Sequence, residues 1–289
     1  MTRLVPALAL ASALCSASAT ILIRRGLRRY SPYTGFWINL AVGTLGVWTA
    51  VLATGGVGRP SLAGIAFFAL AGLIGTVGGR LLRFVSIEAV GASIAAAVIN
   101  LSPVVSSVLA ILILGERVTS AVLVGTLVIV GGTTLLSAGG RRIGLRPAQL
   151  VLPGLSAVCF GVVAVLRKVG LSGMEPIPGM AVNVTAALVA YTAFLLATGQ
   201  REVMVCRGTS LAYFVVAGLA ENLTVYLVVL ALSIGTVSVV MPLASVSPIF
   251  VLVLSFFFLR NIEILDRRIV LGTLLIVTGV YLLTALSGR

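Results

Sequence analysis

The organisation of this chain is decided by residues 116–136, which read ERVTSAVLVGTLVIVGGTTLL. Residues 263–283 repeat this stretch as EILDRRIVLGTLLIVTGVYLL. The two copies are identical at nine of 21 positions, among them a glutamate and two glycines. Apolar segments often match by chance, but Glu and Gly landmarks in the same order rarely do, so the stretch predicts an internal duplication.

Further landmarks repeat in the same order on the amino-terminal side of this stretch. The matched pairs, at separations of 144 or 145 residues, are Pro32 and Pro176, Asn39 and Asn183, and Ser102-Pro103 and Ser247-Pro248. The chain is therefore predicted to consist of two homologous halves, residues 1–140 and residues 141–289.

The composition excludes a soluble protein. Of the 289 residues, 60% are hydrophobic and only 9% are charged, 20 of them basic and 7 acidic. A soluble domain carries about 25% charged residues, and a disordered chain needs low hydrophobicity with high charge. The remaining class is an all-α polytopic membrane protein.

Missing residue types exclude several chemistries. The sequence has no histidine, and its only lysine, Lys168, follows no phosphate-binding glycine loop. Ser–His–Asp catalysis, histidine-ligated metal sites and a Walker-type ATP site are therefore excluded, and we expect no enzymatic activity, no metal and no cofactor. The net charge of +13 is spread over small groups of arginines between apolar runs. That pattern is typical of connections at lipid headgroups, not of a nucleic-acid surface.

Apolar runs of membrane-spanning length predict ten transmembrane helices. The run at 208–259 is interrupted only by Glu221 and is long enough for two crossings, which the turn-forming residues 233–236 would separate. We expect the first run to be an uncleaved span, not a signal peptide. The predicted spans lie within residues 4–23, 30–58, 60–79, 89–115, 118–140, 147–166, 176–200, 209–232, 237–259 and 269–288.

Each half then contains five spans, and this odd number fixes the relative orientation of the halves. The second copy must enter the membrane from the opposite side, which gives two inverted five-helix repeats about an axis in the membrane plane. Two such halves have two nearly equivalent packings, each open to one side of the membrane. This arrangement is a simple basis for alternating access to a solute held between the halves.

Several short motifs resemble those of the EamA family in the drug/metabolite transporter superfamily. In the first half they are Val90-Gly91-Ala92-Ser93, Leu101-Ser102-Pro103, Leu114-Gly115-Glu116-Arg117-Val118-Thr119, Gly125 and Gly131-Gly132. The second half repeats them, without the Gly-Glu dipeptide, as Ile234-Gly235-Thr236, Val246-Ser247-Pro248, Glu263, Gly272 and Gly279. The resemblance covers essentially the whole chain and implies a secondary transporter with cytoplasmic termini. Similar proteins export amino acids, metabolites or drugs, or carry phosphorylated sugars and nucleotide sugars.

The distribution of basic residues predicts the opposite orientation. The connections after the odd-numbered spans contain 14 basic residues, whereas the other side, with both tails, contains 6. Because basic residues favour the cytoplasmic side, this count would place both termini outside the cytoplasm. The charge count and the resemblance thus disagree on orientation.

Glu221 is the sharpest candidate for a functional residue. It lies near the centre of the eighth predicted span, where a charge costs on the order of 3 kcal/mol and normally faces a cavity or a partner. We expect Glu221, Asn222 and Tyr226 to bind solute and Glu221 to carry a coupling proton; the alternative is a structural carboxylate. Arg80 and Arg83 share one face of the third span, and Arg80 is expected to face the same cavity. A zwitterion or an anion would then be a plausible cargo, unless both arginines extend to lipid headgroups.

A second group of candidates surrounds predicted helix kinks. Proline removes a backbone hydrogen bond and leaves carbonyl groups free to meet polar cargo. The predicted kink or gating residues are Pro103, Pro242 and Pro248. The solute-binding candidates of this group are Asn100, Ser102, Ser106, Ser245 and Ser247, to which Asn39 and Asn183 on the second and seventh spans are added. Packing by small residues and hydrogen bonding between helices are the alternative roles.

Four charged residues at span ends are expected to have structural roles. Glu116 and Glu263 stand where the fifth and tenth spans begin, where a carboxylate caps helix amides and complements the helix dipole. Arg24 and Lys168 end the first and sixth spans, where we expect them to anchor the helices at the headgroups.

Together these patterns predict a secondary transporter, an exporter or exchanger of a small polar metabolite, amino acid or drug-like solute. We expect it in a prokaryotic inner (plasma) membrane, as a monomer or homodimer. Its partners would be a small-molecule substrate and the lipid bilayer, with no nucleic acid. One alternative is a translocase of lipid or lipid-linked headgroups that uses an arginine-lined groove. Another is a receptor or assembly factor that transports nothing, for which the helices would pack tightly around Glu221.

Overall fold

The computed structural model describes residues 4–90, 95, 98–99, 101–116, 118–138, 147–258, 271–272, 274–279 and 282. Within these residues the chain is helical and has no strand, in agreement with an all-helical polytopic membrane protein. The first half contributes α1 (Leu4–Gly26), α2 (Pro32–Ala53), α3 (Leu62–Ala71), the π-helix η1 (Gly72–Arg80), α4 (Leu81–Val90), α6 (Ser102–Leu114) and α7 (Ser120–Ala138). The second half contributes η2 (Pro147–Leu150), α8 (Val151–Gly170), α9 (Pro176–Ala197), η3 (Arg201–Met204), α10 (Thr209–Ile234), α11 (Val237–Ala244) and α12 (Ser247–Phe258).

The helix lengths account for some but not all of the ten predicted spans. Six apolar helices in the described residues are long enough to cross a membrane, and α3, η1 and α4 form one of them as a continuous rod. The helices at Ser102–Leu114, Ser120–Leu135 and Val237–Val251 are apolar but shorter. Most of the tenth predicted span, at 269–288, lies outside the described residues. The count of ten is therefore not confirmed.

The outer surface of the bundle is apolar, as a lipid-facing surface must be. Leu45 and Leu52 on α2, Leu112 on α6 and Leu127 on α7 are all more than 60% exposed. A protein in water rarely exposes large apolar side chains so widely. Lipid tails can cover these side chains without a free-energy cost, which agrees with a multi-pass integral membrane protein.

Local sequence signals set several helix ends. Pro32 and Pro176, the matched prolines, both stand at the start of a helix, α2 and α9, where a missing N–H costs nothing. The backbone N–H of Thr34 donates to the Ser31 side chain, which caps α2. Gly115 ends α6 with a φ of 64°, a conformation that glycine adopts without a steric penalty.

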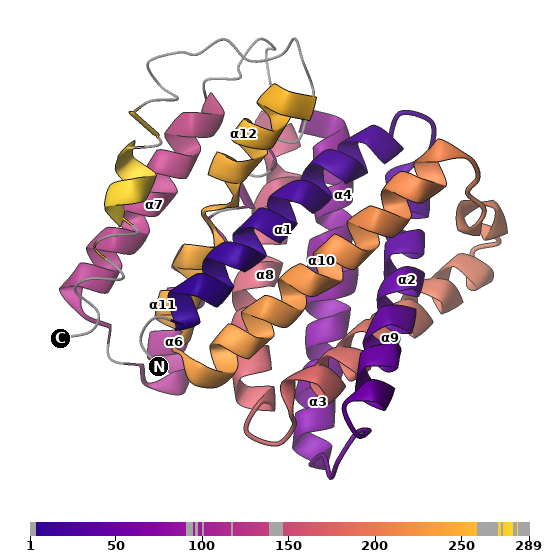
Figure 1. Cartoon of the computed structure of the whole chain (residues 1–289), viewed down its shortest axis with the longest axis horizontal. Coiled ribbons are helices and arrows are strands. Elements are labelled where there is room, and N and C mark those ends of the chain that lie inside the picture. The colour runs from indigo at the N-terminus through magenta and orange to yellow at the C-terminus, as the bar shows by residue number, and fades with distance from the viewer. Residues whose placement is uncertain are drawn as a thin grey trace.

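Helices of each half pack against helices of the other half, and equivalent helices make equivalent contacts. Helix α1 packs along α10 (Figure 1), and its counterpart α8 packs along the rod of α3, η1 and α4. Likewise α12 packs against α1, as α6 packs against α8. Each helix of one half thus lies mainly on helices of the other half, and the interior is an interface between the halves.

Two pairs of equivalent helices run antiparallel. On α2 and α9, Trp37 donates to Thr192 at 3.1 Å and Trp48 donates to Thr185 at 2.9 Å, so the positions ascend on one helix as they descend on the other. On α7 and the segment 271–279, a Cβ at Gly132 would lie 2.8 Å from the carbonyl oxygen of Gly272. A Cβ at Gly279 would lie at the same distance from the carbonyl oxygen of Gly125. These glycines let two helix backbones touch.

Candidate functional site

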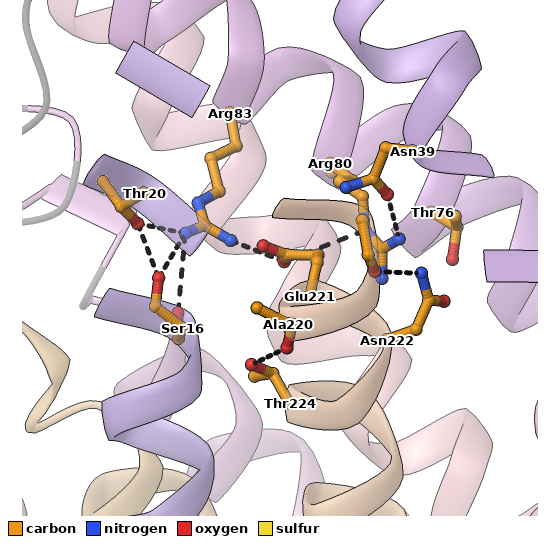
Figure 2. Close-up of polar contacts among 12 residues, drawn as sticks. Ser16, Thr20, Asn39, Thr76, Arg80, Arg83, Ala220, Glu221, Asn222 and Thr224 are labelled. Atoms are coloured by element: carbon orange, nitrogen blue, oxygen red, sulfur yellow. Dashed lines mark hydrogen bonds and ion pairs between the residues drawn. The ribbon is translucent and has the colours of Figure 1, made fainter. Parts of the chain in front are cut away.

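A buried ion-pair network joins the two halves (Figure 2). Arg83 on α4 donates from Nη1 to Oε1 of Glu221 on α10 at 2.6 Å. Arg80, the last residue of η1, places its Nε 3.9 Å from the same oxygen. Glu221 is 3% exposed and lies between the two guanidinium groups. One carboxylate therefore faces two cations inside the bundle.

The Arg83 guanidinium is held by α1 as well. Its Nη2 donates to the Ser16 carbonyl oxygen at 3.3 Å and to the Thr20 hydroxyl. The position of Arg83 is therefore fixed by a carboxylate from one half and by hydroxyl and carbonyl oxygens from the other. The second oxygen of Glu221, Oε2, has no hydrogen-bond partner among the described residues.

Asn39 and Asn222 extend the network towards α2. Arg80 donates from Nη1 to Oδ1 of Asn39 at 2.9 Å, while the buried Nδ2 of Asn39 has no partner in the described part of the chain. Asn222 donates to the Gly218 carbonyl oxygen at 2.7 Å and packs against Gly43, where a Cβ would overlap its amide. Asn39 therefore keeps a spare donor next to a buried cation.

A second polar cluster surrounds Asn183 on α9. Its Oδ1 accepts from Thr76 of η1 at 3.0 Å and, at 3.5 Å, from Nη2 of Arg167 on α8. Its Nδ2 donates to the Phe68 carbonyl oxygen at 3.2 Å. Asn39 and Asn183, matched in the duplication, thus each accept from a buried arginine, although Arg80 and Arg167 are not matched with each other.

The π-helix η1 carries Thr76 and Arg80 into the interface. Its sequence, GLIGTVGGR, is rich in glycine, and a side chain at Gly72 would overlap the Asn183 carbonyl oxygen. Ser156 on α8 donates to the Gly79 carbonyl oxygen at 2.7 Å. π-Helical segments are rare in proteins, and those that occur are often found at functional sites. The apolar run predicted a plain helix here, and only the glycine content signalled otherwise.

A separate cleft of about 560 Å³ lies at the loops. It is lined by residues 57–61, residues 171–176 and Ser233, none of which is a predicted solute-binding residue. Arg59 and Glu175 supply charges of both signs to its wall. The polar network and this cleft are therefore distinct features of the described structure.

Comparison with known proteins assigns the family. The model of the EamA-like transporter family matches residues 4–138 and again residues 150–285. This chain belongs to the EamA-like transporter family. The predicted resemblance is thereby confirmed, and the family consists of membrane transporters and not enzymes.

The fold of this EamA protein is also found in solved structures. One, described only as "Crystal structure of protein", superposes with a TM-score of 0.78 over 97% of this chain and 96% of that chain. The two sequences are 18% identical, so the likeness shows the fold alone. No curated protein sequence matches the chain significantly.

Two of the four serines predicted to line a cavity are hydrogen-bonded to the preceding helical turn. Ser106 donates to the Pro103 carbonyl oxygen at 3.0 Å, and Ser245 donates to the Pro242 carbonyl oxygen at 2.6 Å. Ser102 is buried at the start of α6. The ninth predicted span breaks at residues 245–246 between α11, which contains Pro242, and α12, which begins with Ser247 and Pro248.

The remaining predicted residues are placed as follows. Tyr226 is half-buried and packs against the large apolar core. Asn100 and Glu263 lie outside the described residues. Arg80 and Arg83 are 3% and 9% exposed, so the alternative in which both extend to headgroups is wrong. Arg167 was not among the predicted site residues, because its place beside Lys168 at a span end resembles an interfacial anchor.

Glu116 caps a helix of the opposite half, whereas Arg24 and Lys168 bind the carboxyl ends of helices in their own halves. Glu116 accepts from the backbone N–H groups of Val237 at 2.9 Å and Ser238 at 3.1 Å, so it caps α11 and not the helix that follows it. Lys168 donates to the carbonyl oxygens of Leu232 and Gly235 at the end of α10, and Arg24 donates to that of Ile87 near the end of α4. These charges complement the dipoles of the helices that they contact, and Glu116 does so across the interface between the halves.

Replacing Glu116 with Gln should lower the free energy of unfolding by about 1–2 kcal/mol. A neutral amide accepts weaker hydrogen bonds from Val237 and Ser238 and no longer complements the α11 dipole. Thermal unfolding of the purified protein in detergent measures the change. Glu175→Gln is the matched control, because Glu175 is exposed and makes no capping hydrogen bond. Equal melting temperatures for the two variants would contradict the capping role.

Proposed function

We propose that this EamA protein is a secondary transporter that moves a small polar solute by alternating access between two inverted five-span repeats, residues 1–140 and 141–289. The observation that carries the proposal is the buried Arg83–Glu221–Arg80 network, which joins the halves through charged groups. Buried charges in a membrane interior are costly and are characteristic of solute and ion pathways. Family membership supports the same activity.

The inverted arrangement is supported by the directions of equivalent helices. Helices α2 and α9 occupy matched positions in the halves and run antiparallel, as do α7 and the segment 271–279. Copies that entered the membrane from the same side would place these pairs parallel. The exchange of contacts between the halves supports the same two-fold relation.

The proposed solute site is built around the network. Arg80 contacts both Glu221 and Asn39, and Asn222 on α10 and Asn183 on α9 are also buried. The other proposed contacts are Tyr226, Asn100, Ser102, Ser106, Ser245 and Ser247, with Pro103, Pro242 and Pro248 as gating points. In this proposal Glu221 also carries the coupling proton, and it takes up that proton when its ion pairs separate.

The lipid-headgroup alternative gains no support from the described geometry. A groove that conducts headgroups would present its arginines along a path open to lipid. Arg80, Arg83 and Arg167 are instead enclosed by α1, α9, α10 and their neighbours, and each is less than 10% exposed.

Transport in proteoliposomes tests the proposal. Uptake or efflux of amino acids, amines and organic phosphates should depend on the protein and respond to an imposed pH gradient. Glu221→Gln should abolish the response to the gradient while exchange stays measurable, because the amide cannot carry a proton. Glu202→Gln, at an exposed position of η3, is the control and should behave as the unmodified protein. An unchanged pH response of Glu221→Gln would remove Glu221 from coupling, and no movement of any solute would overturn the transport function.

A further inference from the structure

The interior of the bundle carries more positive than negative charge. Arg80, Arg83 and Arg167 are 3%, 9% and 8% exposed, and all three lie within membrane-spanning helices. Glu221 is the one buried carboxylate among the described residues, whose other glutamates are exposed or half-buried. Two positive charges therefore remain without a counter-ion in this part of the structure.

Arg167 is the least satisfied of these cations. Neither of the two ion pairs in the described chain includes it, and the charged group that acts on it is Arg80, which repels it. Its one hydrogen bond, to Asn183, is 3.5 Å long, and its buried Nε has no partner among the described residues. A buried guanidinium with a neutral acceptor at the limit of hydrogen-bond distance is strongly unfavourable unless an anion joins it.

A spare donor lies beside Arg80. Asn39 is fully buried, its Oδ1 binds Arg80, and its Nδ2 has no partner in the described residues. Two kinds of N–H group are thus unused beside these arginines: the guanidinium Nε of Arg167 and the amide Nδ2 of Asn39. An oxyanion accepts several such hydrogen bonds at once, and arginine recognises carboxylate and phosphate through paired N–H groups.

We propose that Arg167 and Arg80 form a binding site for an oxyanion and that the cargo carries a carboxylate or phosphate group. This inference rests on the proposed transport function and names the chemical class of its solute. The anion neutralises the repulsion between Arg167 and Arg80 and fills the donors that the protein leaves free. A cargo with only an amine or a neutral group gains nothing at this point.

Binding to the purified protein in detergent tests the site without any transport step. The only two tryptophans, Trp37 and Trp48, lie on α2, and Trp37 is two residues from Asn39. Their fluorescence therefore reports on changes around this helix. At least one of inorganic phosphate, acetate and glycine should bind saturably and change the fluorescence, whereas methylammonium should cause no change. Arg167→Gln should weaken that binding at least about tenfold, as expected for the loss of a charged hydrogen bond. Arg201→Gln, the same change at an exposed position, should not.

A second variant supplies the missing charge from within. Asn39→Asp places a carboxylate against Arg80 and loses no hydrogen bond, because Nδ2 of Asn39 donates to no described group. The variant should melt at a higher temperature than the unmodified protein without added anion and should bind the anion more weakly. A lower melting temperature with unchanged anion binding, or no saturable oxyanion for the unmodified protein, would overturn the proposal.

Proteoliposome assays separate this proposal from the transport function. Oxyanions that bind but are not moved would refute transport and leave the site intact. Movement of amines or neutral solutes alone, unchanged in Arg167→Gln, would refute the site and leave transport intact. If movement of a soluble oxyanion depends on Arg167, the carboxylate or phosphate group belongs to a free solute. If flipping of a fluorescent phospholipid depends on Arg167, the group belongs to a lipid headgroup.

Discussion

Replacing Glu221 with Gln should lower the free energy of unfolding by about 3–5 kcal/mol. The carboxylate is buried and is the counter-ion of both Arg83, at 2.6 Å, and Arg80, at 3.9 Å. Its loss leaves two guanidinium groups in a low-dielectric interior, where a charge without a partner is far more costly than in water. Thermal or denaturant-induced unfolding of the purified protein measures the effect.

The double-mutant cycle with Arg83→Gln identifies the cause. The double variant removes both charges of the closest ion pair, so that only Arg80 is left without its counter-ion. Its loss of stability should therefore be smaller than the sum of the losses in the two single variants. Arg201→Gln, combined with Glu221→Gln, is the control and should add nothing to the loss, because Arg201 is exposed. If Glu221→Gln and the unmodified protein have the same melting temperature, the ion pairs do not stabilise the fold.

The charged residues of the network were recognisable one by one in the sequence, but their pairing was not. Glu221 interrupts a long apolar run, and Arg80 and Arg83 share a helix face, so all three stood out as intramembrane charges. Arg83 and Glu221 are 138 residues apart, and the duplication does not match them. Only the tertiary fold, in which the Arg83 side chain on α4 reaches Glu221 on α10, brings them into contact, and no local pattern encodes that arrangement.

The structural features that escaped prediction share this non-local origin. Glu116 was expected to cap the helix that follows it, but it caps α11 from the opposite half. Lys168 was expected to anchor its helix at the headgroups, and its neighbour Arg167 was not singled out, yet Arg167 is buried and donates to Asn183 on α9. The family, the helical class and the duplicated landmarks depend on composition and order along the chain, and these were readable directly.

Glycine content explains how charged residues reach an interface between closely packed helices. Along η1, side chains at Gly72, Gly75 and Gly79 would meet α9 or α8. Their absence lets the backbones approach, and the π-helical geometry then directs Thr76 and Arg80 to the same side as Asn183 and Asn39. The polar network therefore depends on the smallest residues of the rod as much as on its own charges.

Gly72→Ala should accordingly destabilise the protein by about 1–3 kcal/mol or more, the cost of overpacking a filled interior. The added methyl group would overlap the backbone carbonyl oxygen of Asn183, which cannot rotate away as a side chain does. Separation of η1 from α9 would also lengthen the 3.0 Å hydrogen bond between Thr76 and Asn183. Gly154→Ala on α8 is the matched control, because a Cβ there meets nothing within 4 Å and alanine favours the helix. The melting temperature in detergent should fall for Gly72→Ala and stay the same or rise for Gly154→Ala. The same result for both variants would mean that the close contact between η1 and α9 at Gly72 does not stabilise the protein.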